Sequence, residues 1–416
     1  MSLRKVVVTG MGAVSPYGEG VSVLMENLYA DRSAVVSMKE AWKGLVDNLD
    51  CWLGAPMPQP LDVKSIPRQN LKTMGKTAIM SYFAAKEALQ QADISQPYFS
   101  SGRMGVSFSS TTGSADSMES FFRECFTNST ENKMSSGIFF KIMSHTTAAN
   151  LACGFNICGR VISPCSSCSS AAQSIGLGFE CIQNGLQDIM VCGGADELHF
   201  VVNISFDLVQ ATSFRYNENP TESPRPFDKD RDGTVCGEGA GCLVLESEES
   251  ALSRGATILG EVIGFSTLSN GVHIAHPQTQ SIVQCLNNAL DLAGKQPDEI
   301  DYVNAHGTGT IAGDIAEAQA ICQVFGEQAV AVSSLKGHFG HTLGASGALE
   351  LIACLKMMEN NTLIPTHNFQ QPGEGCEGIA HVQKQTKSVI NTFIKNSFAF
   401  GGINTVLVLK RYKDEK

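Results

Sequence analysis

The sequence predicts an α/β fold, because short apolar strands ending in glycine-rich turns alternate with helical stretches. Forty glycines are scattered through the 416 residues, 43% of residues are hydrophobic and 17% are charged. This composition is typical of a globular protein with a large core. Strands that alternate with helices favour largely parallel sheets. The length suits two fused units better than one.

The first half contains four such strands, each followed by a turn rich in glycine or serine. One helix is predicted over residues 77–92. Another begins at Ser169 and places Ala171, Ile175, Gly178 and Ile182 on one face at helical spacing. The four strands lie within residues 5–18, 102–114, 160–168 and 187–197.

Near residue 250 the pattern restarts. Residues 239–256 predict a strand and a helix, and residues 258–271 resemble the opening strand, with Gly10 aligned to Gly264 and Ser15 to Ser269. This weak repeat predicts two related halves, residues 1–250 and 251–416, in one compact body. The later strands are predicted within 300–310, 329–347 and 406–412.

Charge and cysteine content limit the class of protein. The net charge is 30 − 41 = −11, which disfavours nucleic-acid binding. No apolar run approaches 18 residues, and the first strand follows the N-terminus without the apolar core of a signal peptide. Fourteen cysteines are too few for a disulfide scaffold. We therefore expect a cytoplasmic protein, not bound to membranes, with mostly buried cysteines.

Cys165 and Cys168 form a C-x-x-C motif with several possible functions. A zinc site needs a second pair of ligands at similar spacing, and none follows. A thioredoxin-like redox pair also sits between a strand and a helix, but that fold is much shorter. Buried structural thiols are the simplest interpretation, and we adopt it for Cys165.

Cys168 differs because it lies where the turn ends and a helix begins. Free backbone N–H groups and the helix dipole favour a thiolate and a nearby oxyanion at this point. The four residues after it, 169–172, are Ser-Ser-Ala-Ala, small enough for another backbone to approach closely. This crowding is typical of a nucleophile elbow. We expect Cys168 to be a nucleophile.

Two histidines occupy similar glycine-rich turns after apolar strands, His306 in "NAHGTGT" and His341 in "GHFGHTLGASG". A cysteine nucleophile needs such partners for proton transfer or carbonyl polarisation. Structural histidines are the alternative. Lys336 precedes His341 by five residues, and we expect it either at the surface or paired with Asp314 or Glu317.

Over nearly its whole length, the sequence resembles the elongating β-ketoacyl–acyl-carrier-protein synthases of the thiolase-like superfamily. Seven motifs in the same order carry the resemblance. They are "VVVTGMGAVSPYG", "SSCSSAAQSIG", "DIMVCGGADE", "RPFDKDRDGTVCGEGAG", "NAHGTGTIAGD", "LKGHFGHTLGASGALE" and "NSFAFGGIN".

The resemblance implies a role for each matching residue. Cys168 is the implied nucleophile, and its backbone N–H forms the oxyanion hole with that of the gating Phe400. The other implied site residues are His306, His341 and Lys336 in catalysis, Glu350 in support, Thr308 and Thr310 along the pantetheine arm, and Phe206 and Phe398 along the acyl slot. Asp314 and Glu317, the possible partners of Lys336, are further supporting candidates.

The resemblance also implies a fold and a reaction. The fold is thiolase-like, with two pseudo-symmetric halves layered α/β/α/β/α. The reaction is decarboxylative condensation of a malonyl group with an acyl chain on Cys168, in fatty-acid, type II polyketide or aryl-polyene synthesis. No metal, nicotinamide or flavin is implied. A biosynthetic thiolase is one alternative, but "NSFAFGGIN" lacks the second cysteine it would need. A non-catalytic subunit is another.

The implied partners are acyl carrier protein and a second subunit, either identical or a paralogue resembling a chain-length factor. Carrier proteins of this family are acidic. Lys64, Arg68, Lys72 and Lys76 recur every four residues, which predicts a basic stripe on one helix face for docking. An ordinary solvated face is the alternative.

Overall fold

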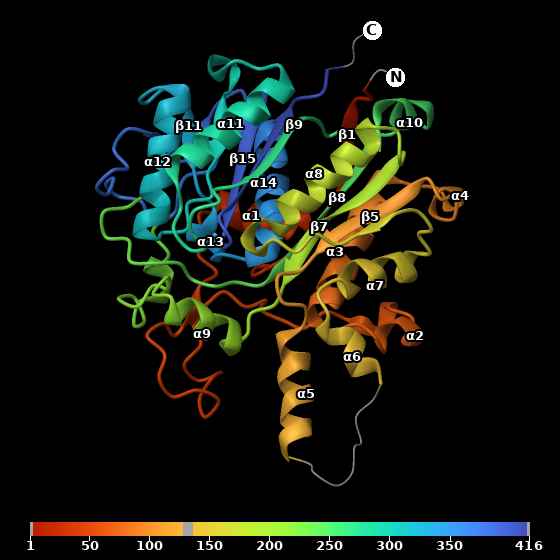
Figure 1. Ribbon diagram of the computed structural model, residues 1–416, viewed down its shortest axis with the longest axis horizontal. Coiled ribbons are helices and arrows are strands. Elements are labelled where there is room, and N and C mark those ends of the chain that lie inside the picture. The colour runs from red at the N-terminus through yellow and green to blue at the C-terminus, as the bar shows by residue number, and fades with distance from the viewer. Residues whose placement is uncertain (1–2, 128–135, 414–416) are drawn as a thin grey trace.

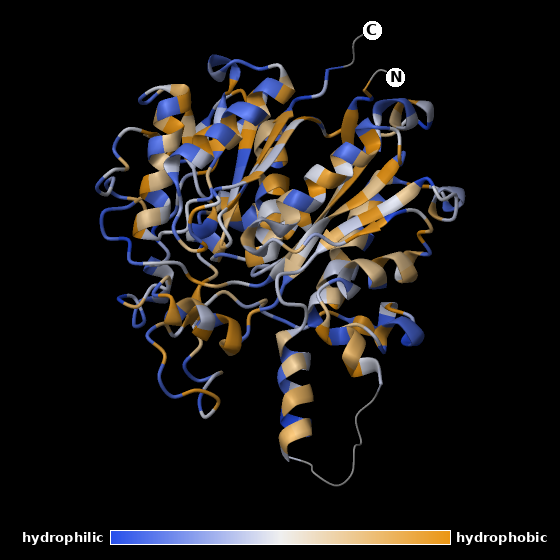
Figure 2. Ribbon diagram, viewed as in Figure 1, coloured by the Kyte–Doolittle hydropathy of each residue, from blue (hydrophilic) through white to orange (hydrophobic). Residues whose placement is uncertain are grey.

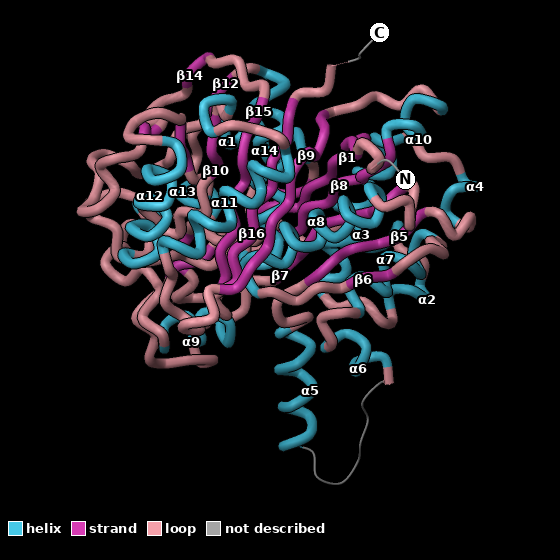
Figure 3. Tube along the Cα trace, turned by 45° about the horizontal axis from the view of Figure 1, so that its top comes forward, coloured by secondary structure: helices cyan, strands magenta, loops and turns pink. Residues whose placement is uncertain are grey.

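One sheet of 12 strands runs through the whole protein (Figures 1 and 3). The computed structural model describes residues 3–127 and 136–413. The strand order is β13-β11-β10-β15-β16-β9-β1-β8-β7-β5-β6, with β2 attached to β1. At the centre β1 and β9 run antiparallel, with Val7 opposite Glu261. The two halves of the chain therefore share one continuous sheet.

The N-terminal half contributes one side of this sheet and most of the helices around it. Its strands are β1 (Val6–Ser15), β2 (Gly18–Glu19), β5 (Met104–Ser109), β6 (Val161–Ile162), β7 (Ile189–Asp196) and β8 (Gly239–Ser247), with β3 (Val36–Ser37) and β4 (Leu53–Gly54) paired separately. Its α-helices are α1 (Val21–Tyr29), α2 (Arg68–Leu71), α3 (Lys76–Ala92), α4 (Gln96–Phe99), α5 (Ala115–Thr127), α6 (Gly137–Ile142), α7 (Thr146–Phe155), α8 (Ser170–Gln183), α9 (Phe200–Leu208) and α10 (Glu248–Ser253).

The C-terminal half contributes the other side. Its strands are β9 (Gly260–Ser269), β10 (Tyr302–Asn304), β11 (Ala331–Ser333), β13 (Ala380–His381), β15 (Thr392–Ala399) and β16 (Ile403–Lys410), with β12 (Thr362–Leu363) and β14 (Thr386–Lys387) paired separately. Its α-helices are α11 (Thr279–Ala293), α12 (Ile311–Phe325), α13 (Lys336–Phe339) and α14 (Ser346–Asn360).

The halves are related by pseudo-symmetry. If the five main strands of each half are numbered in chain order, both halves have the order 3-2-4-5-1, from β6 to β1 and from β11 to β9. β1 and β9 are both ten residues long and begin 260 − 6 = 254 residues apart. The internal repeat expected from Gly10 and Gly264 is therefore a structural repeat. The boundary between residues 250 and 251 stays a prediction.

The expectation of largely parallel sheets is wrong, because the sheet is mixed. Only β5, β6 and β7, and likewise β10, β11, β13 and β15, form parallel pairs. Parallel pairs need a long crossover, usually a helix. β15 and β16 instead form a hairpin with Ala399 opposite Ile403, and β1 and β9 pair antiparallel with their neighbours.

The fold has five layers, because the strands of the two halves lie on opposite sides of the central helices α8 and α14 and each half is covered by outer helices (Figure 1). On one outer side, α3 packs against β1 and β8, and on the other, α11 packs against β9 and β16. Between them, α8 contacts β7 and β9, while α14 contacts β8 and β15. This is the α/β/α/β/α arrangement that the resemblance implies.

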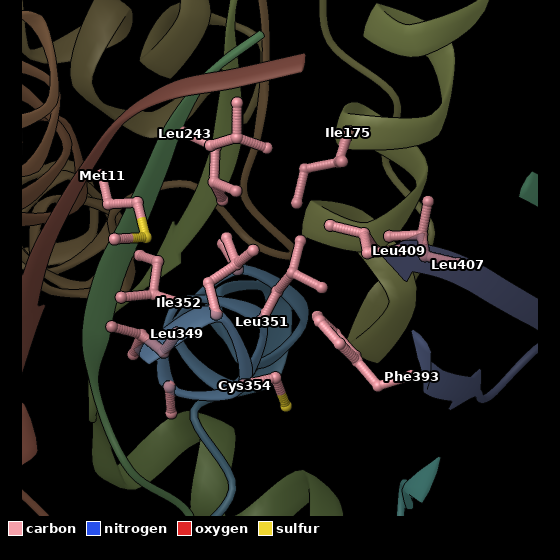
Figure 4. Packing of buried hydrophobic residues seen from close by; sticks show 14 of the residues in the cluster. Met11, Ile175, Leu243, Leu349, Leu351, Ile352, Cys354, Phe393, Leu407 and Leu409 are labelled. Carbon is pink, nitrogen blue, oxygen red and sulfur yellow. The ribbon is translucent and has the colours of Figure 1, made fainter. Parts of the chain in front are cut away.

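The central layer holds the largest apolar cluster. Figure 4 shows Leu351 and Ile352 of α14 among Leu243 of β8, Ile175 of α8 and Phe393 of β15. Both halves therefore contribute to one core. Figure 2 shows the strands as mostly hydrophobic. Across the described residues, no helix is long and apolar enough to span a membrane.

α5 stands out from the body of the protein (Figures 1 and 3). Its Phe122 and Phe126 are exposed, and so are Phe139 and Phe140 of α6. Exposed aromatic side chains on the two contacting helices α5 and α6 form an apolar patch of the kind that marks interaction sites.

The close contacts of the outer helices generate a stability prediction. A Cβ on Gly264 of β9 would lie 2.5 Å from the backbone oxygen of Ala289 in α11, so α11 would have to move. Gly264→Ala should therefore lower the free energy of unfolding by about 1–3 kcal/mol, the usual cost of overpacking. Chemical denaturation measures this change.

Gly260→Ala in the same strand is the matched control. Its Cβ would meet the ends of the flexible Leu355 and Met358 side chains, which can shift. An equal loss of stability in both variants would contradict the argument that backbone proximity of α11 is decisive.

Candidate active site

Cys168 lies at the start of the central helix α8, in the short 3-10 turn Ser167–Ser169 that follows β6. Ser167 adopts a left-handed conformation with φ 49°, a strained geometry for a residue with a side chain. Only 4% of Cys168 is exposed, and it lines a cavity of about 380 Å³. The expected position of Cys168 at the N-terminal end of a helix is confirmed.

The crowding predicted around Cys168 is also observed. α14 approaches α8 so closely that a Cβ on Gly347 would lie 2.7 Å from the backbone nitrogen of Ala172. A Cβ on Gly194 of β7 would likewise clash with Ala171. The small residues after Cys168 therefore let the two central helices meet at their N-terminal ends.

Burial raises the pKa of the Cys168 thiol to about 11, although the Ser167 hydroxyl and Lys336 oppose this rise. The expected lowering of this pKa at the helix N-terminus is outweighed by desolvation, which is the larger effect. The thiol is neutral at pH 7. Negative charge that develops on its sulfur during a reaction still meets the N-terminal end of α8.

The structure brings His306 and His341 to the same cavity as Cys168. Their ring centroids are 5.4 Å apart and their planes nearly perpendicular. Burial, together with the charge of Lys336, holds the pKa of both imidazoles well below the ordinary value. Both histidines are therefore neutral at pH 7 and able to donate one hydrogen bond each.

The hydrogen bonds of His341 assign its tautomer. The backbone N–H of Leu343 donates to Nδ1, at 3.3 Å, and Ser346 Oγ lies 2.9 Å from the same nitrogen. Because Nδ1 accepts, the proton of the neutral ring is on Nε2. His341 Nε2 is buried and has no hydrogen-bond partner among the described residues. It is a donor free for a substrate oxygen.

Lys336 is fully buried and pairs with Glu350, so both expected alternatives, a surface position and a pair with Asp314 or Glu317, are wrong. Its Nζ lies 2.7 Å from Glu350 Oε1 and donates to the backbone oxygen of His306 at 2.5 Å. The two other carboxylates are occupied by backbone N–H groups. Glu317 accepts from His306 and Gly307, and Asp314 accepts from residues 227, 308 and 309.

Sequence reasoning missed Lys395, a second buried lysine in β15. Its Nζ lies 3.0 Å from Glu350 Oε2, and neither side chain is exposed. Glu350 therefore bridges two ammonium groups. The only signal in the sequence was a lysine inside the apolar strand "TFIKNSFA". Its charge also contributes to the low pKa of His306 and His341.

The remaining predicted pocket residues belong to the same cavity. Thr308, Thr310, Phe206, Phe398 and Phe400 all line the cavity. The rings of Phe206 and Phe400 lie 5.4 Å apart, and that of Phe398 lies 5.8 Å from His306. The two threonine hydroxyls are 3.0 Å apart.

Phe400 lies in the β15–β16 turn, where it is 37% exposed. The turn is tied to the loop after β9. Gly401 donates to the backbone oxygen of Ile274, and Asn270 donates to that of Gly402.

Two further expectations are wrong, one about Cys165 and one about the basic stripe. Cys165 is exposed, not buried, and its thiol donates to the backbone oxygen of Thr111. Lys64, Arg68, Lys72 and Lys76 do not share one helix face, because Pro67 and Gly75 divide the segment into a 3-10 turn, α2 and the start of α3. All four are exposed, but Lys76 is paired with the buried Glu238.

A cysteine at a helix N-terminus shares one cavity with two neutral imidazoles, an arrangement that suits covalent cysteine chemistry at a carbonyl carbon. Family models agree. The model described as "Beta-ketoacyl synthase, N-terminal domain" matches residues 3–251, and "Beta-ketoacyl synthase, C-terminal domain" matches residues 259–370. The chain belongs to the beta-ketoacyl synthase family.

Individual relatives resemble the chain along its full length. A 3-oxoacyl-[acyl-carrier-protein] synthase 1 from Buchnera aphidicola is 35% identical, over 99% of this chain and 100% of the relative. The crystal structure of a beta-ketoacyl synthase from Burkholderia phymatum has a TM-score of 0.95 at 38% identity, covering 99% of this chain and 100% of that one. The thiolase-like fold is thereby confirmed, and the thiolase alternative gains no support.

Two further structures come from polyketide systems, and each covers 99% of this chain and 100% of its own. The ishigamide ketosynthase/chain length factor has a TM-score of 0.91 at 30% identity. A type II polyketide acyl-carrier protein in complex with its ketosynthase has a TM-score of 0.89 at 28% identity.

The buried charges generate a prediction about pH. Lys395→Gln removes one of the positive charges that disfavour protonation of the imidazoles, so the pKa of His306 and His341 should rise. Imidazole ¹⁵N chemical shifts, followed over pH, measure this change. Lys410→Gln, which removes a partly exposed ion pair with Glu261, is the control and should leave both values unchanged. Unchanged values in Lys395→Gln would contradict the role of its charge.

Proposed function

We propose that this protein is a β-ketoacyl–acyl-carrier-protein synthase that condenses a malonyl group with an acyl chain held on Cys168, with loss of carbon dioxide. The observation that carries the proposal is one cavity that contains Cys168 and two neutral histidines. Family membership and the relatives named 3-oxoacyl-[acyl-carrier-protein] synthase support it.

In the first step, Cys168 Sγ attacks the thioester carbonyl of the acyl group on the carrier's phosphopantetheine. The bond from that carbonyl to the pantetheine sulfur breaks, and the thiol proton passes to the departing sulfur. The N–H groups of Cys168 and Phe400 receive the developing oxyanion. Loss of one such donor typically lowers the rate by about 10²–10³.

In the second step, His306 and His341 donate hydrogen bonds to the thioester oxygen of malonyl carrier protein. Carbon dioxide leaves, and the electron pair of the broken carbon–carbon bond forms an enolate that these donors stabilise. The enolate carbon attacks the acyl carbonyl, Cys168 leaves as a thiolate and then takes up a proton. Neutral imidazoles suit this role, since a donor needs its N–H but no net charge.

The entrance residues suit the substrate arm. Thr308 and Thr310 offer hydroxyls to the amides of pantetheine, and Phe206 and Phe398 offer apolar contact to the acyl chain. Phe400 covers the entrance. The residues of this chain supply every group that the two steps use, so the proposed reaction involves no metal, nicotinamide or flavin.

Acyl carrier protein is the proposed partner at Lys64, Arg68 and Lys72, which remain exposed. The exposed phenylalanines of α5 and α6 support a second subunit, either another copy of this chain or a paralogue resembling a chain-length factor. The solved ketosynthases with a carrier protein and with a chain length factor support both partners. We propose a cytoplasmic location, where carrier proteins and reduced thiols are present.

Cys168→Ala should abolish acyl transfer from acyl carrier protein, lowering condensation by about 10³-fold or more. Whole-protein mass spectrometry, which detects the acyl adduct, and product formation measure this. Cys165→Ala is the matched control and should keep both. Loss of the adduct in Cys165→Ala alone would contradict the assignment of the nucleophile.

A variant with His341→Ala should still form the adduct but lose carbon dioxide release from malonyl carrier protein.

The docking surface has its own test. Arg68→Glu combined with Lys72→Glu should weaken carrier binding about tenfold at low salt, because two exposed charge contacts of about 0.7 kcal/mol each sum to about 1.4 kcal/mol. The loss should shrink as salt screens the charges. Fluorescence anisotropy with labelled acyl carrier protein measures it. Lys384→Glu, another exposed lysine, is the control. If Lys384→Glu weakens carrier binding equally, the loss reflects the net charge of the protein and not a docking surface at Arg68 and Lys72.

A further inference from the structure

Three side chains with metal-binding atoms meet outside the proposed active site. Asp31 follows α1, His338 lies in α13, and His367 lies in the loop after β12. The ligand atoms of all three lie within 4.8 Å of one another. Asp31 Oδ1 is 3.0 Å from His338 Nε2 and 2.9 Å from His367 Nδ1. None of the three is among the described residues that line the Cys168 cavity.

We propose that Asp31, His338 and His367 form a binding site for one divalent metal ion of the zinc class. Two imidazole nitrogens and one carboxylate oxygen are ligands that Zn²⁺ and Co²⁺ accept readily. Three protein ligands leave a fourth position for water. The site is independent of the proposed condensation reaction, which uses other residues.

The two contacts of Asp31 are close to the ligand spacing of a tetrahedral site. Metal bonds of about 2.0–2.2 Å require ligand atoms about 3.3 Å apart, so Asp31 Oδ1 must move a few tenths of an ångström away from each histidine nitrogen. Asp31 can make this adjustment because its side chain is 56% exposed. The same exposure gives a hydrated ion a route to the site.

The two histidines are held in place before any ion binds. The backbone oxygen of His338 accepts from Tyr17 Oη at 3.0 Å and from the backbone N–H of Ala34 at 2.7 Å. Gly337 lets His367 lie beside His338, since a Cβ there would be 2.5 Å from the backbone oxygen of His367. The ring centroids are 5.1 Å apart.

The His338 ring makes a close hydrogen-bond contact at this cluster, where its Nε2 lies 3.0 Å from Asp31 Oδ1. It is fully buried, and its other nitrogen, Nδ1, has no hydrogen-bond partner within the described part of the chain. Its Nε2 is therefore the atom that directs the ring towards Asp31 and His367. A metal at that point would join the loop after α1 to α13, whose first residue is Lys336.

The test uses the tag-free full-length protein, treated with chelator and then titrated with Co²⁺. We expect one equivalent to bind with the visible spectrum of a four-coordinate ion and without sulfur-to-cobalt charge transfer. Zn²⁺ should displace it and raise the melting temperature. His367→Gln and Asp31→Asn, both at solvent-accessible positions, should each weaken binding at least tenfold. His273→Gln, in an exposed loop, is the control and should bind as the parent does.

Two results would overturn the proposal. One is no cobalt binding by the parent protein, in which case the three side chains only hydrogen-bond to one another. The other is a spectrum with sulfur ligation, or binding that persists in both variants, in which case the ion sits on cysteines or elsewhere. Circular dichroism confirms that each variant is folded. None of these outcomes depends on condensation activity.

Discussion

The site depends on one buried carboxylate, Glu350. Two ammonium groups, those of Lys336 and Lys395, contact its two oxygens where no solvent reaches. A lone buried lysine would favour its neutral form, and a neighbouring carboxylate favours the charged form. Through Lys336, the same pair holds the backbone of His306. Burial lowers the pKa of both imidazoles most, and the two ammonium charges lower it further. One carboxylate therefore holds the two lysines that position His306 and help to keep both histidines neutral.

Much of this could be predicted from the sequence because the signals are local. The turns around Cys168, His306 and His341 each join an apolar strand end to small residues, and motif order identified the family. Lys395 could not be predicted, because the side of β15 that faces inward depends on its pairing with β10 and β16. The predicted partners of Lys336 were wrong because the actual partner, Glu350, lies on α14, and the packing of that helix beside Lys336 is a tertiary feature. The prediction of a basic stripe was wrong because it assumed one helix, whereas Pro67 and Gly75 divide the segment.

Pseudo-symmetry explains the shape of the site but not its chemistry. The turn before α14 repeats the turn before α8, with Leu343 at φ 50° where the other has Ser167 at φ 49°. This offset of 343 − 167 = 176 residues matches the start of α14 to that of α8. It pairs Cys168 with Gly344, and His341 with Cys165. The two halves thus use the same turn to present different side chains, and the Cys168 sulfur has no counterpart in the second half.

The pairing of β1 with β9 has a mechanical consequence. Because β1 and β9 join the two halves by backbone pairing, a hinge motion between the halves would break the sheet, unlike the motion of the lobes in many two-domain enzymes. Conformational freedom around the cavity is therefore left to short segments. The β15–β16 turn, with two glycines at positive φ after Phe400, is one of them.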